Sequence, residues 1–194
     1  MTTRLEQQFA FLLEAEKLKS VTRATPIHDG SRPENSGEHS WSLALYALIL
    51  ADQAGPGVDI SRAIRMLLLH DLVEIDVGDV PIHAQSGAAQ DAPALLAAER
   101  IFGLLPEDQG TELLALWQEF EANETPTAVF AKSLDRTQPV LLNLRAGGGS
   151  WDEFNVTLPQ LEARVGSKIA RGLPVVWQAV RARILPWFEA RNRL

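Results

Sequence analysis

The sequence contains no cysteine, which excludes disulfide bonds and thiol catalysis. A chain without cysteine suits a cytoplasmic location, and we expect that location here. Residues 1–6 show no signal-peptide pattern, and the longest apolar stretch, about residues 43–51, is too short to cross a bilayer. We therefore expect no membrane association.

Several motifs of catalysis and of nucleic-acid binding are also missing. There is no glycine-rich phosphate loop of the nucleotide-triphosphatase type and no Gly-x-Ser-x-Gly nucleophile elbow. The formal net charge is −7 and no basic tract is present, so we expect no binding to a nucleic-acid backbone. A single small anion could still bind, because a local metal ion and an arginine outweigh a diffuse negative field.

What the sequence does contain is a nearly continuous series of helical patterns. Apolar residues recur at helical spacing, and no strand alternation of useful length is present. Asn35-x-x-Glu38 resembles a capping box, and Asp59 or Ser61 can cap the helix that follows. The predicted fold class is all-α, with helices at about 5–18, 36–54, 59–76, 93–104, 107–122 and 126–146.

The predicted organisation is a single domain over residues 1–194. Residues 1–146 form its core, and residues 151–194 form C-terminal helices that pack on this core or at a dimer seam. The glycine run 147–149 between them is a candidate hinge or linker. Residues 21–36 and residues 78 to about 91 are predicted to form loops. The second loop is a candidate mobile flap, and whether residues 84–92 close over a ligand stays open.

Four polar residues lie on otherwise apolar helices: His39, His70, Asp71 and Asp135. An ionised carboxylate in apolar surroundings is costly unless it is paired or binds a metal. Two imidazoles and two carboxylates from three helices can form a mixed nitrogen and oxygen site for one divalent cation. The alternative is that local hydrogen bonds or cations satisfy them, and four nearby cations are candidates: Arg62, Arg65, Lys132 and Arg136.

The wider pattern around these residues resembles a known family. It comprises Leu18-Lys19-x-Val21-x-Arg23, Arg32-Pro33-Glu34-Asn35-x-x-Glu38-His39-Ser40, His70-Asp71-x-x-Glu74-x-x-x-Gly78-Asp79-x-Pro81, Leu116-Trp117-x-Glu119-Phe120-Glu121 and Lys132-x-x-Asp135. In order and spacing it is similar to the HD superfamily of metal-dependent phosphohydrolases, and within it to the 5′-deoxynucleotidase branch. The resemblance covers about residues 5–145 and implies a helical bundle with a buried metal site.

The resemblance also implies a role for each matching residue. His39, His70, Asp71 and Asp135 would hold one divalent metal ion, for which manganese, cobalt and magnesium are candidates. Glu74 would be the catalytic acid and base, although it can equally be a supporting carboxylate. Arg23 would bind the substrate phosphate and Asp79 the sugar or the leaving-group oxygen, whereas a surface arginine and a turn cap are the plainer interpretations.

The implied activity is a metal-dependent phosphomonoesterase that releases phosphate from nucleoside 5′-monophosphates through a metal-activated water. The branch also implies a homodimer. Residues 151–194 lie outside the resemblance, and Arg32, Glu34 and Lys132 have no firm role. Asp76 matches no family position and is expected to be solvated. Between His70-Asp71 and Asp135 the only histidine is His83, so a second metal would lack ligands.

The chain departs from the branch beside Arg23. The bacterial enzyme has a tryptophan directly after this arginine, where it helps to reject the ribose 2′-hydroxyl, but here Ala24-Thr25-Pro26 follow. Selection for deoxy sugars is therefore in doubt. Two alternatives stay open, namely a hydrolase for a cyclic nucleotide, a pyrophosphate or a non-nucleotide ester, and a non-catalytic module that binds a nucleotide.

Overall fold

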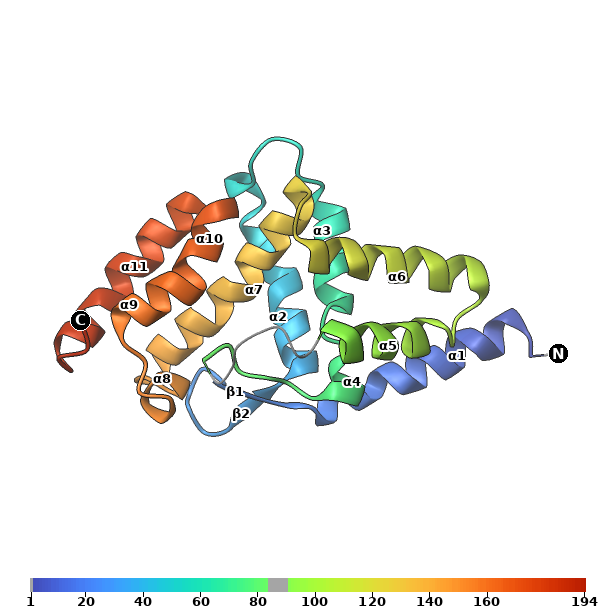
Figure 1. The fold of residues 1–194 in the computed structure, drawn as a ribbon, viewed down its shortest axis with the longest axis horizontal. Helices are drawn as coiled ribbons and strands as arrows, with labels where there is room; N and C mark the ends of the chain where they lie inside the picture. The colour runs from blue at the N-terminus through green and yellow to red at the C-terminus, as the bar shows by residue number, and fades with distance from the viewer. Residues whose placement is uncertain (1, 84–90) are drawn as a thin grey trace.

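A computed structural model describes residues 2–83 and 91–194 of the chain, and almost all regular structure in this part is helical (Figure 1). The α-helices are α1 Arg4–Ala15, α2 Ser36–Ile49, α3 Ile60–Leu69, α4 Glu74–Val77, α5 Asp91–Phe102, α6 Glu107–Ala122, α7 Pro126–Arg145, α8 Ser150–Glu153, α9 Leu158–Leu161, α10 Ser167–Gly172 and α11 Pro174–Glu189. Shorter 3₁₀ or π-helical segments are Glu16–Ser20, Ala51–Gln53 and Glu162–Gly166. The all-α prediction is confirmed, and residues 84–90, where most of the predicted flap falls, lie outside the described residues.

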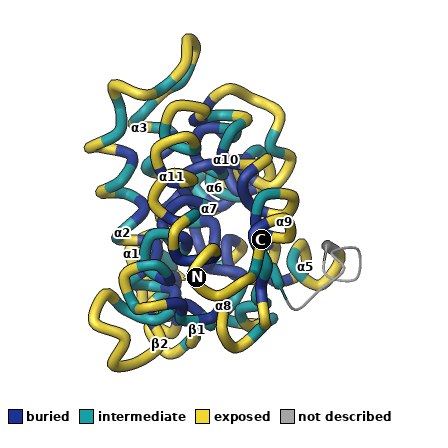
Figure 2. The backbone as a smooth tube through the Cα atoms, turned by 90° about the vertical axis from the view of Figure 1, so that its left-hand side faces the viewer, coloured by how far each residue is buried: buried dark blue, intermediate teal, exposed yellow. Residues whose placement is uncertain are grey.

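Helix α7 is the element around which the others pack. It starts at the N-cap Thr125, whose side chain accepts a hydrogen bond from Ala128 N, and a proline follows at its first position. Helices α2, α3, α6, α10 and α11 all contact it. Buried backbone is concentrated around α7, and exposed backbone lies on the outer turns (Figure 2). Side chains on α7 therefore reach the centre of the molecule.

One buried apolar cluster joins the C-terminal helices to this centre. It contains Leu43 of α2 and Leu134 of α7 together with Trp151, Trp187 and Phe188 from the last forty-five residues. The three aromatic rings pack with centroid separations of 4.8 to 5.2 Å. Residues from 150 onward are thus packed on α7, which supports the single-domain proposal.

Residues 22–35 form a small sheet where the sequence predicted a loop. Strands β1 (Thr22–Pro26) and β2 (Pro33–Asn35) pair antiparallel, with Thr22 opposite Asn35 and Pro26 opposite Pro33. The strands have five and three residues, with prolines at their ends, and are too short to show alternation of apolar and polar residues. They could therefore not be predicted from the sequence. The sheet holds Arg23 beside the start of α2.

The helix predicted to run from residue 59 to 76 is interrupted at residues 70–73, within the stretch that contains His70 and Asp71. Asp59 caps α3 as predicted, but α3 ends at Leu69, residues 70–73 form turns, and α4 begins at Glu74. Glu74 N donates to Asp71 O at 2.9 Å, and Trp117 Nε1 donates to His70 O at 3.1 Å. The sequence did not predict this break, because the pattern of apolar residues continues across it. The break changes the directions of the side chains of His70 and Asp71.

The glycine run 147–149 is a packed connection between α7 and α8. All three glycines have positive φ, and Gly148 N donates to Asn143 O at 2.8 Å. The Asn143 side-chain oxygen accepts hydrogen bonds from Ser150 N and Ser150 Oγ at 2.8 and 3.0 Å. The glycines permit a tight turn that brings α8 against α7.

Because of this packing, the two ends of the glycine run differ in the space available for a side chain. A Cβ at Gly149 would lie 2.4 Å from Asn143 Oδ1 and 2.8 Å from Pro26 Cγ, whereas one at Gly147 would meet no described atom within 4 Å. Both alanine substitutions place a side chain at positive φ, which costs about 1–2 kcal/mol. Gly149→Ala should lose a further 1–3 kcal/mol or so through overpacking. Urea unfolding of Gly149→Ala and Gly147→Ala measures the difference, and equal losses would mean that the turn is not tightly packed.

Candidate metal centre

Three buried side chains from three elements converge at the centre of the molecule. His39 lies one turn into α2, His70 follows the end of α3, and Asp135 lies in the middle of α7. His39 Nε2 is 3.1 Å and His70 Nε2 is 3.7 Å from Asp135 Oδ1. One ligand atom from each residue lies within 4.8 Å of the others, which is close enough for a shared metal ion. Among the described residues this trio is a group suited to such an ion.

The hydrogen bond of His70 determines which of its two ring nitrogens is free to act as an acceptor toward the other residues of the trio. Its Nδ1 lies 2.9 Å from the carbonyl oxygen of Leu67, which can only accept, so Nδ1 carries a proton. Its Nε2 is buried and has no hydrogen-bond partner, although Asp71 Oδ1 is 2.9 Å away. In the neutral ring, a nitrogen lone pair therefore faces carboxylate lone pairs. A cation or a proton is needed between them.

A relay of hydrogen bonds orients His39 in the same way. Gln138, one turn beyond Asp135, donates from its side-chain nitrogen to Glu34 Oε2 at 2.9 Å. Its oxygen then accepts from His39 Nδ1 at 3.0 Å, which leaves His39 Nε2 directed at Asp135. Such outer hydrogen bonds usually fix metal-binding histidines. Glu34 is 3% exposed and supports the site, while Arg32 pairs with Glu38 at the start of α2.

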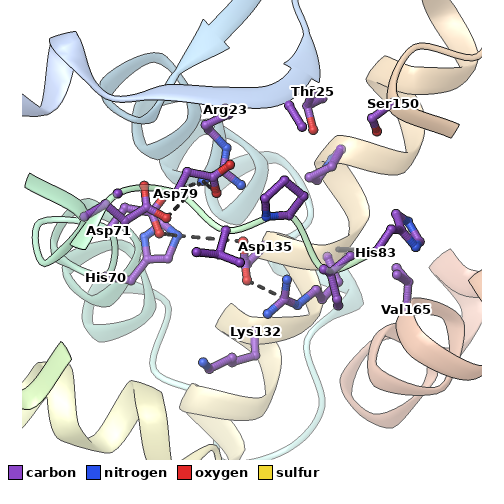
Figure 3. A pocket seen from close by; sticks show the side chains of 18 of the residues that line it. Arg23, Thr25, His70, Asp71, Asp79, His83, Lys132, Asp135, Ser150 and Val165 are labelled. Carbon is purple, nitrogen blue, oxygen red and sulfur yellow. Dashed lines mark hydrogen bonds and ion pairs between the residues drawn. The ribbon is translucent and has the colours of Figure 1, made fainter. Parts of the chain in front are cut away.

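Asp71 adjoins the trio and is held by Arg23. Its Oδ2 accepts a hydrogen bond from Arg23 Nη1 at 2.8 Å. The same guanidinium lies 3.5 Å from Glu34, 3.6 Å from Glu74 and 3.6 Å from Asp79. Figure 3 shows Arg23 next to Asp79. Arg23 is thus the shared cation of four carboxylates.

These charges shift the pKa values of the centre in opposite directions. Burial opposes ionisation of Asp71, but His70 and Arg23 outweigh it and hold its pKa well below the usual range. For His70, burial opposes protonation, yet Asp71 and Asp135 raise its pKa to about 10. Burial likewise opposes ionisation of Asp135, and Arg136 and the two histidines keep its pKa low. Without a metal, a proton therefore occupies His70 Nε2 at neutral pH.

Glu74 behaves differently from its neighbours. Burial, followed by the charge of Asp71, raises its pKa to about 8. Ser36 Oγ donates a hydrogen bond to Glu74 Oε2 at 2.6 Å. Burial is also the largest cause that raises the pKa of Asp79, against the opposing effect of Arg23. A carboxyl group with a pKa near neutrality can both take and release a proton.

A pocket of about 270 Å³ opens beside the trio. Arg23, His70, Asp71, Glu74, Asp79 and Asp135 line it, and Figure 3 shows the labelled ones together on one side. Ala24 and Thr25 of β1 form one wall, and Ser150, Trp151 and Val165 from the C-terminal helices form another. The pocket is at the small end for ligand sites, so it suits a small molecule.

The structure brings together all seven residues that the sequence singled out, but by a different local route. The sequence placed Glu74 on the same helix face as His70, whereas a turn separates α3 from α4 and brings Glu74 to the pocket. Asp76, which we expected to be solvated, bonds to Arg100 at 2.6 Å. Gln138 was missed, and its only signal was a polar residue three positions after Asp135 on a buried helix.

The donor set fits a divalent metal ion. Imidazole nitrogens and carboxylate oxygens suit several first-row ions, and the unpartnered His70 Nε2 is placed to bind such an ion in place of a proton. Both histidines are oriented by hydrogen bonds at Nδ1, as metal ligands usually are.

Comparisons with known proteins agree with the sequence resemblance. The family model described as HD domain matches residues 15–177. The protein named 5′-deoxynucleotidase HDDC2 from Homo sapiens is 32% identical over 133 residues, which are 68% of this chain and 64% of the relative. A protein named 5′-deoxynucleotidase from Enterobacter sp. is 26% identical over 170 residues, or 83% of this chain and 84% of that protein. The matched part thus spans slightly less than two thirds of the human relative.

A solved structure extends the similarity to the whole chain. A predicted metal-dependent phosphohydrolase from Magnetospirillum magnetotacticum MS-1 is 42% identical, with a TM-score of 0.92 over 100% of this chain and 99% of that one. The PH0347 protein from Pyrococcus horikoshii OT3 is 24% identical, with a TM-score of 0.66 over 90% of this chain and 99% of that one, and it shows the fold alone.

The geometry predicts that Asp135 is needed for metal binding. Asp135→Asn keeps the size of the side chain but removes a charged ligand, so affinity for Mn²⁺ should fall by roughly tenfold or more. The matched control is Asp76→Asn, which removes a carboxylate outside the trio. Metal content after dialysis against Mn²⁺, measured by mass spectrometry, tests this. Equal content in Asp135→Asn and the parent would rule out the assignment.

Proposed function

The chain belongs to the HD-domain family, and on this basis we propose that it is a metal-dependent phosphomonoesterase acting on nucleoside 5′-monophosphates. The observation that carries the proposal is the buried trio of His39, His70 and Asp135 at a small pocket, with an unpartnered imidazole nitrogen. The names of the human and bacterial relatives support the substrate class.

We propose that His39, His70, Asp71 and Asp135 hold one divalent ion, with manganese, cobalt and magnesium as candidates. When bound, such an ion lowers the pKa of a coordinated water and polarises a phosphoryl oxygen. One role of Arg23 is then to keep the buried Asp71 ionised, and its 2.8 Å hydrogen bond to Asp71 supports this role.

Glu74 handles the protons in this proposal. Ser36 occupies its Oε2, so Oε1 is the atom that takes a proton from the attacking water. The water oxygen bonds to phosphorus as the ester P–O bond breaks, and the leaving sugar oxygen receives the proton that Glu74 has taken up. A pKa of about 8 in the metal-free protein places Glu74 close to the useful range for such transfer.

Arg23 and Asp79 are the proposed substrate-binding residues on the N-terminal side of the pocket. Both line it, which supports contact with a ligand. The side chains of Ala24 and Thr25 line it as well, so a small residue lies where the bacterial branch has a tryptophan. We therefore propose that ribonucleotides are accepted along with deoxyribonucleotides.

We also propose a homodimer formed through α2. Trp41, Leu45, Leu48 and Ile49 make an apolar strip along one face of this helix, and they are 67%, 42%, 59% and 70% exposed. Such a strip is typical of a protein interface. An open apolar groove lined by Ile49 and Val175 continues it. A cytoplasmic location is proposed on composition alone, and no described helix is long and apolar enough to cross a membrane.

The activity test is phosphate release from a panel of ribo- and deoxyribonucleoside 5′-monophosphates, with Mn²⁺ or Co²⁺ and a chelator control. We expect release that depends on the metal, with similar rates for the two sugars. Glu74→Gln should lower kcat about 10²- to 10⁴-fold, because the amide cannot accept the proton.

Metal content separates chemistry from folding in this test. Glu74→Gln should bind as much metal as the parent, since Glu74 is no ligand in the proposal. Unchanged turnover in Glu74→Gln would remove its catalytic role. If the protein hydrolyses a cyclic nucleotide, a pyrophosphate or a non-nucleotide ester but not the monophosphates, the proposed substrate class is wrong.

The dimer proposal predicts that a charge in the strip separates the subunits. Leu48→Glu should lower the molar mass measured by light scattering from two chains to one, because a buried carboxylate at the interface is costly. Leu96→Glu is the matched control, since Leu96 is 67% exposed on α5. A parent protein that is monomeric at tens of micromolar concentration would contradict the proposal.

A further inference from the structure

Among the described residues, three arginine or lysine side chains line the pocket, and they differ in how closely carboxylates pair with them. Arg23 faces four carboxylates and is 11% exposed. Lys132 Nζ lies 3.0 Å from Glu121 Oε1 and 4.4 Å from the centre of the Phe120 ring. Arg136 is the third. Arg23 and Lys132 therefore have partners within the protein.

Arg136 has a much weaker partner among the described residues. Its Nε lies 3.5 Å from Asp135 Oδ2 without a hydrogen bond, and this buried Nε has no hydrogen-bond partner. The Arg136 side chain is 29% exposed and lines the pocket. Asp135 is at the same time in contact with both histidines of the trio. The positive charge of Arg136 therefore faces the pocket and is only partly neutralised by Asp135.

The surroundings of Arg136 are positive on the C-terminal side of the pocket. The pKa of His83, which also lines the pocket, falls to about 4 through burial and the charges of Arg164 and Arg136. The pKa of Lys168 is lowered by burial and then by Arg136 and Lys132, with Asp135 opposing. In the described part of the pocket, three carboxylates, Asp71, Glu74 and Asp79, are gathered on the other side around Arg23, whereas only Glu121 and Asp135 lie next to Lys132 and Arg136. The pocket is therefore electrostatically asymmetric.

A cation held next to a divalent metal ion is unfavourable unless enough negative charge lies between them. In the proposed enzyme Asp135 binds the metal, so Arg136 would face a divalent ion across one shared carboxylate. A phosphoryl group that contacts both the metal and Arg136 would remove this repulsion, and the planar guanidinium matches the geometry of phosphate oxygens. We propose that Arg136 binds the phosphoryl group of the substrate, as a second cation in addition to Arg23.

This inference rests on the proposed function for its substrate, but it makes a separate statement about phosphate binding. The competing role for Arg136 is that of a counter-ion which keeps Asp135 ionised. In that case its loss would weaken metal binding. In the phosphate-binding role its loss would leave metal binding intact or strengthen it, because a repulsive charge is removed.

The test measures binding of inorganic phosphate to the Mn²⁺-loaded protein, by calorimetry and by the rise in Tm. Arg136→Gln should raise the Kd of phosphate about 10- to 100-fold, as expected for a lost charge-assisted hydrogen bond. Mn²⁺ affinity should stay within about twofold of the parent or become tighter. Lys168→Gln is the matched control, because it removes a cation near Arg136 that does not line the pocket.

A conservative variant keeps the test valid if Arg136→Gln is unstable. Arg136→Lys retains the charge but not the fork of donors, and it should recover part of the phosphate affinity. Unchanged phosphate affinity in Arg136→Gln, an equal loss in Lys168→Gln, or a tenfold loss of Mn²⁺ affinity would each overturn the proposal. A parent that binds phosphate but hydrolyses no monophosphate would refute the proposed function and leave the assignment of Arg136 standing.

Discussion

The whole centre depends on burying several acids in one place. Glu34, Asp71, Glu74, Asp79 and Asp135 lie around one arginine and two histidines, and few of them reach solvent. Like charges at this spacing repel strongly in a medium of low dielectric, so the arrangement requires cations between them. Arg23 supplies one permanent cation. The other is variable, a proton on His70 or a metal ion in its place.

The architecture follows from this requirement. The sheet of β1 and β2 brings Arg23 to the acids, the cap of α2 sets His39 one turn inside the helix, and the turn after α3 directs His70 and Asp71 inward. Helix α7 then presents Asp135 and Gln138 from its buried side. The acids come from three segments, namely residue 34, residues 71–79 and residue 135, so no rearrangement of one segment relieves the repulsion. The surrounding apolar cluster holds these segments together.

The sequence predicted the helices and the identity of the central residues well, because both leave marks in spacing. Asn35 and Asp59 were predictable as caps, and polar residues within apolar runs drew attention to His39 and Asp135. The break after Leu69 was not predictable, since the apolar run continues across it. Arg23 looked like a free phosphate ligand, because its four carboxylate neighbours are between 11 and 56 positions away in the chain. Contacts of that kind depend on tertiary packing and leave no local pattern.

The C-terminal wall of the pocket has a consequence for biosynthesis. All the acids and both histidines are encoded before residue 136, while Trp151 and Val165 come later and depend on α10 and α11 for packing. A chain emerging from the ribosome thus presents the acids and histidines of its centre first. The ligand-enclosing half follows only when the final helices dock on α7. Until then the acidic centre lacks this wall of the pocket.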